Sequence, residues 1–377
     1  MTLRLTLIFF LTLQIGCREP YQPPASDDQS NLLVVDAFLD GTKKSCTVVL
    51  SRSQSVLAKE TKPMEKAATV QLEDSKGSIY TLNEISDGIY NVSNVTIDTQ
   101  MKYQLRLKTE GGKSYQSDFV EIKYTPPIDN ITWEANDHGL QFYVSTHDDD
   151  KKSLYYQYRF VETWEYVAPL YSAFEIKNGI AVPRKDNIYR CWATDSSTSI
   201  SVATSVKLNA DIISNFPFYL IVKPSQKYLI RYSILVKQNV LTVEAYNYWK
   251  QLQKNTEKLG TLFDPQPSQI LGNVRNVDNA DEPVLGYFNA GITTEKRIFV
   301  NSTELPSDFF FSGDDKCQAN SDRDTIKASD LNGFSGFLIR GIYGSSPTPD
   351  KFIYSPTITC VDCRQSGSGT NKMPEFW

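Results

Sequence analysis

The chain has 377 residues, of which 40% are hydrophobic and 22% are charged, values typical of globular proteins with about two or three domains. Its net charge of −5 excludes the basic footprint that a nucleic-acid-binding protein carries. The 21 Tyr and 19 Phe far outnumber the 4 Met, a composition that favours strands over helices. The two histidines, His138 and His147, limit histidine-based catalysis and metal binding.

Residues 1–17 have the pattern of a signal peptide that ends in a lipidatable cysteine. The apolar run 5–13 is too short to span a bilayer, which needs about 20 residues, but has the length of a signal-peptide core. Gly16 is the small residue that cleavage requires, and Cys17 follows it as in a bacterial lipobox. Gln14 stands where Leu is usual, so an ordinary secretory signal is the alternative. We expect Cys17 to carry lipid, and we expect no transmembrane helix.

Residues 18–31 hold three prolines and no apolar periodicity, which is typical of an extended tether. Residues 32–125 then predict an Ig-like β-sandwich, because short alternating segments are separated by turns that contain glycine. The alternation places these apolar residues on shared strand faces: Leu33, Val35 and Ala37; Cys46, Val48 and Leu50; Val70 and Leu72; Tyr103, Leu105 and Leu107.

Thr125-Pro126-Pro127 marks the expected domain boundary, because prolines cannot donate to a β-ladder. Residues 126–377 predict a larger, fibronectin-III-like β-rich domain. Trp133 lies on its first strand candidate, and aromatic residues mark the third. Later strand candidates are 200–208, 218–222, 228–236, 284–289, 296–300 and 336–343.

The periodicity changes near 243–258, which predicts an inserted amphipathic helix of about four turns. Thr242 is the expected N-cap, and Gly260 suits the position after the C-cap. Apolar residues recur at three-residue steps: Val243, Tyr246, Trp249 and Leu252. Because a short helix is marginal without packing, we expect the Trp249 face to pack on the second domain.

Cysteine is the most informative chemistry in the sequence. Cys46 shares an apolar strand face and predicts a buried free thiol. The remaining cysteines of the exported body form an even set of disulfide candidates: Cys191, Cys317, Cys360 and Cys363. Of the three possible connectivities we expect one in which Cys360 and Cys363 bond separately to Cys317 and Cys191. A zinc site and a redox CxxC are the alternatives, although the Gly- and Ser-rich segment that follows does not favour the helix a redox site uses.

Other polar and aromatic groups favour structural interpretations. The acidic run 148–150 could bind calcium, but it lacks EF-hand spacing and two lysines follow it, so we expect a solvated turn. Glu162 and Glu165 could be paired catalytic carboxylates, but on a strand this spacing puts them on opposite faces. One aromatic group could form a ligand platform or pack in the core: Trp164, Tyr166 and Tyr171. We expect no catalytic residue, metal or cofactor.

Several strings carry a family resemblance: NLLVVDAFLDG, CTVVLSRS, HDDDKKSLYYQYRFVETWEY, RCW, RYSILVKQNVLTVEAYNYWKQLQKNTEKLGTLFDPQPSQILGNV, CVDCR and the terminal MPEFW. Together they resemble Bacteroidota outer-membrane lipoproteins that share a domain of unknown function, over about 31–377. The resemblance implies an Ig-like domain followed by a larger β-rich domain, genes beside those of TonB-dependent receptors, and no established catalytic residues. The family pattern has a further cysteine just after the GN of ILGN, where this chain has Val274. If Cys191 pairs there in the family, it would be free here.

These observations predict a non-catalytic binding or accessory lipoprotein, anchored in the outer membrane, that works with a TonB-dependent transporter. The membrane leaflet, the ligand and the oligomeric state are left open. The competing interpretations are an exported hydrolase with the larger domain as catalyst, and a structural envelope protein without a small ligand.

Overall fold

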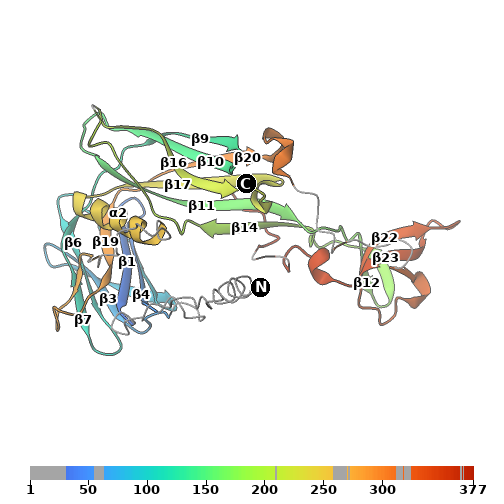
Figure 1. Cartoon of the computed structure of the whole chain (residues 1–377). Coiled ribbons are helices and arrows are strands. Elements are labelled where there is room, and N and C mark those ends of the chain that lie inside the picture. The colour runs from blue at the N-terminus through green and yellow to red at the C-terminus, as the bar shows by residue number, and fades with distance from the viewer. Residues whose placement is uncertain are drawn as a thin grey trace, which may run out of the picture.

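The computed structural model describes residues 31–54, 63–208, 210–257, 270, 272–310, 317, 324–365, 367 and 369–377. Cys17, the signal peptide, residues 18–30 of the expected tether and Gly260 lie outside the described residues. Within them the chain is mainly β, as predicted. A first sandwich, a second sandwich and a small distal lobe follow one another along the molecule (Figure 1).

The first sandwich is a continuous sheet folded over a single core. Across the sheet its strands are β18 (Val274–Asn276), β7 (Ser114–Ser117), β6 (Lys102–Lys108), β3 (Thr69–Asp74), β4 (Ile79–Ser86), β5 (Ile89–Ser93), β2 (Ser45–Arg52), β1 (Leu33–Asp40) and β19 (Leu285–Gly291), with β8 (Val120–Glu121) beside β6. The sheet folds at β4, whose first half pairs with β3 and whose second half pairs with β5. The predicted faces meet in this core, where Val35, Val48 and Leu105 are fully buried.

The first sandwich includes β18 and β19, which lie in the sequence between two strands of the second sandwich. The sequence predicts the strand at 284–289 as part of the second domain, but β19 runs parallel to β1 and buries Phe288 and Ala290 in the first core. Gly286 makes this approach possible. Its φ is +117°, and a Cβ there would lie 1.8 Å from the Val35 carbonyl oxygen.

The second sandwich packs two sheets around an aromatic core. One sheet has the order β16 (Ile212–Val222), β10 (Gly139–His147), β9 (Ile128–Asn136). The other has the order β14 (Arg190–Ser196), β11 (Tyr155–Val167), β17 (Arg231–Val240), β20 (Thr294–Asn301), with β15 (Ser201–Thr204) beside β11. Buried side chains of the two layers meet as the alternation predicts: Leu140, Phe142 and Val144 against Tyr156, Tyr158 and Phe160. Trp133 is half-buried against this core.

The expected boundary segment lies between the sandwiches and is fixed by hydrogen bonds to β17. The Thr125 hydroxyl accepts from the Val240 amide at 3.0 Å, and the Pro126 carbonyl accepts from Gln238 Nε2 at 2.8 Å. Since these groups are buried, the connection is part of the packed structure rather than a free linker.

The predicted helix is present as α2 (Val243–Glu257), and the Thr242 hydroxyl caps it by accepting from the Ala245 amide at 3.2 Å. Its buried stripe differs from the expected one: Val243 is exposed and Trp249 is half-buried, whereas Ala245 and Tyr248 are buried. Constant three-residue steps drift around a helix of 3.6 residues per turn. The observed stripe is Leu241, Ala245, Tyr248 and the partly buried Leu252, whose steps of four, three and four stay on one face.

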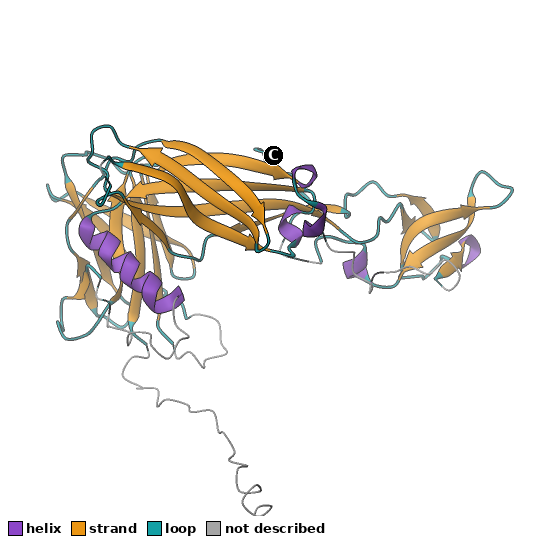
Figure 2. Cartoon of the chain, turned by 45° about the horizontal axis from the view of Figure 1, so that its top comes forward, coloured by secondary structure: helices purple, strands orange, loops and turns teal. Residues whose placement is uncertain are grey.

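Helix α2 joins the two sandwiches. It contacts β11 and β15 of the second sandwich, as expected, and β19 of the first. Figure 2 shows the helix, in purple, lying across the strands at this junction. Its buried residues share a cluster with Val202 on β15 and Tyr287 on β19.

The distal lobe is a separate small unit at the far end of β11 and β14 (Figure 1). It contains the hairpin β12 (Phe174–Lys177) and β13 (Ile180–Pro183), and a sheet with the order β21 (Thr325–Lys327), β23 (Pro349–Ser355), β22 (Phe337–Tyr343). Its core buries Leu331, Leu338 and Phe352. The sequence predicted the strand at 336–343 but not the lobe.

Short 3-10 helices complete the described elements: η3 (Gln226–Tyr228), η4 (Ser302–Glu304), η5 (Ser307–Phe309), η7 (Ala328–Asp330) and η8 (Ile358–Cys360).

Candidate ligand-binding site

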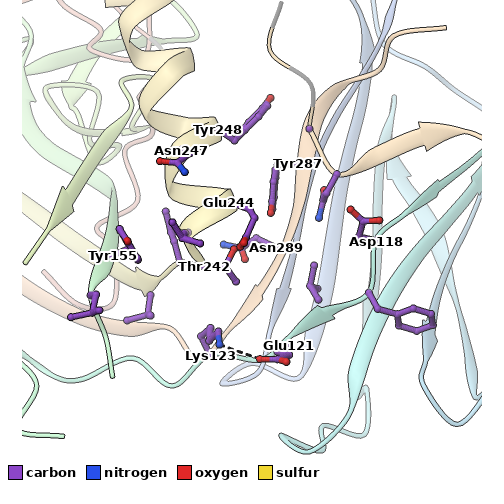
Figure 3. A pocket seen from close by; sticks show the side chains of 18 of the residues that line it. Asp118, Glu121, Lys123, Tyr155, Thr242, Glu244, Asn247, Tyr248, Tyr287 and Asn289 are labelled. Atoms are coloured by element: carbon purple, nitrogen blue, oxygen red, sulfur yellow. Dashed lines mark hydrogen bonds and ion pairs between the residues drawn. The ribbon is translucent and has the colours of Figure 1, made fainter. Parts of the chain in front are cut away.

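A pocket of about 960 Å³ lies where the two sandwiches and α2 meet (Figure 3). One wall comes from the first sandwich, through β19 and the segment 118–123. The opposite wall comes from the first half of α2 and from Leu154 and Tyr155 at the start of β11. Its volume is at the upper end of the range for small-molecule sites, and junctions between domains are a common location for them.

Strand alternation places two side chains of β19 in the pocket. Phe288 and Ala290 face the first core, so Tyr287 and Asn289 point away from it, toward α2. In Figure 3 Tyr287 lies beside Tyr248, and Asn289 lies near Thr242 and Glu244. The Tyr248 and Tyr287 rings are 5.2 Å apart, and burial raises the pKa of Tyr248 to about 12. These phenols are therefore neutral at physiological pH.

Asn289 has an unmet hydrogen-bonding group. The side chain lines the pocket with 6% of its surface exposed, and its Nδ2 is buried without a hydrogen-bond partner among the described residues. An unpaired buried donor costs about 1–3 kcal/mol. A ligand acceptor oxygen would recover that cost once the side chain turns its Nδ2 into the pocket, since this atom has almost no accessible surface as it stands.

The edge of β19 is capped at this wall. The side-chain amide of Asn273 donates to the Phe288 carbonyl at 2.9 Å and accepts from the Phe288 amide at 2.8 Å. Farther along, the Ile292 amide donates to the Lys123 carbonyl at 2.8 Å. These bonds occupy the backbone of Phe288, between the two lining side chains of β19, and of Ile292, the first residue after the strand.

The charges of the described lining residues balance. Three lysines, Lys102, Lys123 and Lys152, face three acids, Asp118, Glu121 and Glu244. The ammonium groups of Lys123 and Lys102 lie 3.1 and 3.2 Å from the Glu121 carboxylate. The hydrogen bond from Lys123 is the largest effect that lowers the pKa of Glu121. The described lining therefore carries three charges of each sign, and Glu121 is paired with two of the lysines.

The predicted disulfides are formed. Cys191 bonds to Cys363 with Cα atoms 5.8 Å apart, and Cys317 bonds to Cys360 with Cα atoms 5.4 Å apart. Cys191 is thus paired although Val274 stands where the family pattern has cysteine. Cys46 is a buried free thiol, as expected, and burial raises its pKa to about 12. The CxxC therefore supplies one cysteine to each of these disulfides.

Glu162 and Glu165 point to opposite faces of β11, as their spacing predicts. Glu162 is buried in the second sandwich and accepts from the hydroxyls of Tyr232 and Tyr219 and from Lys227. Glu165 lies on the other face, 2.9 Å from the Arg190 guanidinium. Neither lines the junction pocket.

The remaining candidates are structural or dispersed. The 148–150 run forms a turn in which Asp148 accepts from the amides of Asp150 and Lys152. Trp164 and Tyr166 pack in partly buried clusters, whereas Tyr171 is 59% exposed, so they do not form one platform. His147 is exposed and pairs with Asp129 at 2.8 Å. In the described part of the chain no three His, Cys, Asp or Glu side chains are grouped as metal ligands.

Sequence reasoning found Thr242 as a helix cap but missed the pocket that it lines. Tyr287 and Asn289 lie in a strand whose partner, β1, is about 250 residues earlier, so no local pattern shows that they face α2. A polar Asn within the apolar string GYFNAG was the available signal.

Comparisons with known proteins give a family. Among the described residues no helix is long and apolar enough to cross a membrane. No curated protein matches the chain. A matching solved structure is the chicken interferon gamma receptor alpha chain, 12% identical over 56% of this chain and 89% of that chain, with a TM-score of 0.15. Residues 18–297 match "Domain of unknown function (DUF4249)", and the chain belongs to this family.

Proposed function

We propose that this protein is a membrane-tethered binding or accessory lipoprotein of the outer membrane that works with a TonB-dependent transporter and presents the junction pocket to a ligand. The observation that carries the binding role is the pocket itself, walled by both sandwiches and α2, with the unpaired Asn289 donor in its wall. The anchor comes from the signal-like segment that ends at Cys17. The transporter comes from the resemblance to Bacteroidota lipoproteins.

Binding is preferred to hydrolysis because the buried carboxylates of β11 already have structural partners. Glu162 is held by tyrosine hydroxyls and Lys227, and Glu165 by Arg190 and the indole of Trp377. A hydrolytic acid or base would need to face a substrate. The carboxylates that line the pocket, such as Glu121, are exposed or paired with lysine.

The anchor is tested by Cys17→Ser in the native host. We expect the wild-type protein in the outer-membrane fraction and the processed Cys17→Ser variant in soluble fractions. Cys46→Ala is the matched control, because it removes a cysteine that forms no disulfide. A processed Cys17→Ser protein that still partitions with membranes would contradict the anchor.

The partner is tested by copurification of the full chain from detergent-solubilised outer membrane, with mass spectrometry of the bound proteins. We expect a TonB-dependent receptor as a stoichiometric partner that survives Cys46→Ala. The accessory role would be contradicted if the lipidated protein were recovered alone from an extract in which the TonB-dependent receptors are fully solubilised.

A further inference from the structure

We propose that the junction pocket binds a neutral oligosaccharide and that Asn289 donates a hydrogen bond to one of its oxygens. This inference rests on the proposed binding role of the pocket and names the class of ligand. It is carried by the charge balance of the walls, the capped edge of β19, and the pairing of amides with aromatic rings.

The charge of the lining selects against a strongly charged ligand. Glu121 is paired with both Lys102 and Lys123, and Asp118 is paired with Arg275 from β18. A phosphate or polyanion would meet Lys102 and Lys123 with a carboxylate already beside them. A polycation would meet Asp118 and Glu121 with a cation already beside them. An uncharged ligand leaves these pairs intact.

The capped strand edge selects against a peptide that would add to the sheet. Peptides gain affinity at sheet edges through main-chain hydrogen bonds. Here Asn273 occupies both backbone groups of Phe288, and Lys123 accepts from Ile292. Between these points β19 exposes the span of only a few residues, too short for a peptide ladder.

The remaining lining chemistry suits hydroxyl groups on a carbon ring. Amide side chains, which offer a donor and an acceptor side by side, come from both walls: Asn247 on α2 and Asn289 on β19. Phe119 lies in the wall with 43% of its surface exposed, and Tyr155 lies opposite it on β11. A sugar can place its C–H face on such a ring while its hydroxyls reach the amides. A cavity of about 960 Å³ admits several sugar rings rather than one.

The experiment probes the detergent-purified full chain with an array of neutral oligosaccharides and, in parallel, an array of uncharged peptides. The oligosaccharide that binds best is then titrated calorimetrically against wild type, Asn289→Ala, Phe119→Ala and Tyr158→Phe. Tyr158→Phe is the matched control, because it also removes a buried hydrogen-bonding group without a partner, but in the second core and away from the pocket.

We expect about tenfold weaker binding for Asn289→Ala, from one lost hydrogen bond, and unchanged binding for Tyr158→Phe. If Asn289→Ala fails to fold, Phe119→Ala decides, since its exposed ring can be removed without opening a core. The inference is overturned if no neutral oligosaccharide binds, if neither pocket variant weakens binding, or if an uncharged peptide displaces the sugar. A peptide or other ligand in the pocket would leave the proposed binding role standing, and membrane fractionation tests the anchor independently.

Discussion

The second sandwich is attached to its neighbours by different means at its two ends. At the junction with the first sandwich, α2 and β19 are held by burial of Ala245, Tyr248 and Tyr287. At the distal end, Cys191–Cys363 bonds β14 to the segment after the lobe, and Cys317–Cys360 closes a second loop there. The small lobe core of Leu331, Leu338 and Phe352 explains the contrast, because small units need covalent links to remain folded.

The different attachment of the two ends also explains why the candidate site lies at the junction. The junction is assembled from side chains of three elements, so it can leave a pocket of about 960 Å³ between them and still be stabilised by the surrounding aromatic contacts. The distal end instead packs Tyr166 against Cys363, and the Tyr166 hydroxyl donates to the Cys363 carbonyl at 2.9 Å. Ligand binding is therefore expected to change the stability of the junction and not that of the distal end.

The largest effect is expected at the distal end, from the Cys191→Ser/Cys363→Ser double variant. The bridge joins residues 172 positions apart, so its loss should lower the free energy of unfolding by about 5 kcal/mol on the chain-entropy account. Urea denaturation with and without reductant measures this loss. Cys46→Ala serves as the control. A double variant as stable as wild type would show that the distal end does not depend on this bond.

At the junction, Tyr248→Ala should lower the free energy of unfolding by about 3–5 kcal/mol, as for other buried aromatics. Trp249→Ala is the matched control. It shortens the neighbouring residue, whose ring is half-buried beneath the Arg159 guanidinium at 5.5 Å, and should cost about half as much. Hydrogen exchange of α2 locates the loss. If Trp249→Ala lowered the free energy of unfolding more than Tyr248→Ala, the buried stripe would be the one expected from the sequence.

The sequence predicted those features that depend on local spacing. Alternation at Leu33, Val35 and Ala37 predicted a buried face, and the Thr242 cap predicted the start of α2. The cysteines predicted the disulfides because an exported chain can keep them. Each of these follows from residues close in sequence or from the chemistry of one residue type.

The features that were missed depend on long-range pairing. The return of β19 to β1 is not visible in either strand alone, since both are ordinary apolar segments. The distal lobe brings β12 together with β22, more than 150 residues later, and just before β12 the Ala173 amide donates to the Ile339 carbonyl at 3.0 Å. The pocket lies at one such long-range contact, so its residues had no local signal.

Alkaline pH should weaken the junction. Burial raises the pKa of Tyr248 to about 12, whereas an unfolded tyrosine titrates near 10. Because the folded state favours the neutral phenol, this stabilisation is complete below about pH 10 and is lost as the pH rises toward 12. Between about pH 10 and pH 12 the free energy of unfolding, measured by urea denaturation, should fall by about 2 kcal/mol less for Tyr248→Phe than for wild type. If the free energy of unfolding fell equally with pH in both proteins, the pKa of Tyr248 would be the same in the folded and unfolded states.

The C-terminus adds non-covalent contacts to the distal end of the sheet. The Trp377 ring lies 5.2 Å from the Arg231 guanidinium, and its indole donates to Glu165 at 3.3 Å. The Phe376 ring lies 3.5 Å from the guanidinium of Arg297. No sequence pattern predicted these contacts, because the tail is polar and Gly-rich before its last residues.

Removal of Phe376 and Trp377, which leaves a chain that ends at Glu375, should cause the smallest loss in the free energy of unfolding. Each lost cation–π contact at a partly exposed site is worth about 0.5–1 kcal/mol, and Glu165 keeps Arg190 as its partner. We expect a loss of about 1–2 kcal/mol by urea denaturation followed by far-UV circular dichroism, against no change for Met373→Ala, whose side chain is 62% exposed. If truncation cost as much as removing the Cys191–Cys363 bond, the two ends would be held alike by side-chain packing. A small loss in the free energy of unfolding that adds to the loss in the disulfide variant means that the two contributions are independent. In that case the Cys191–Cys363 bond restrains the tail, and Phe376 and Trp377 only complete the contact of the tail with the sheet.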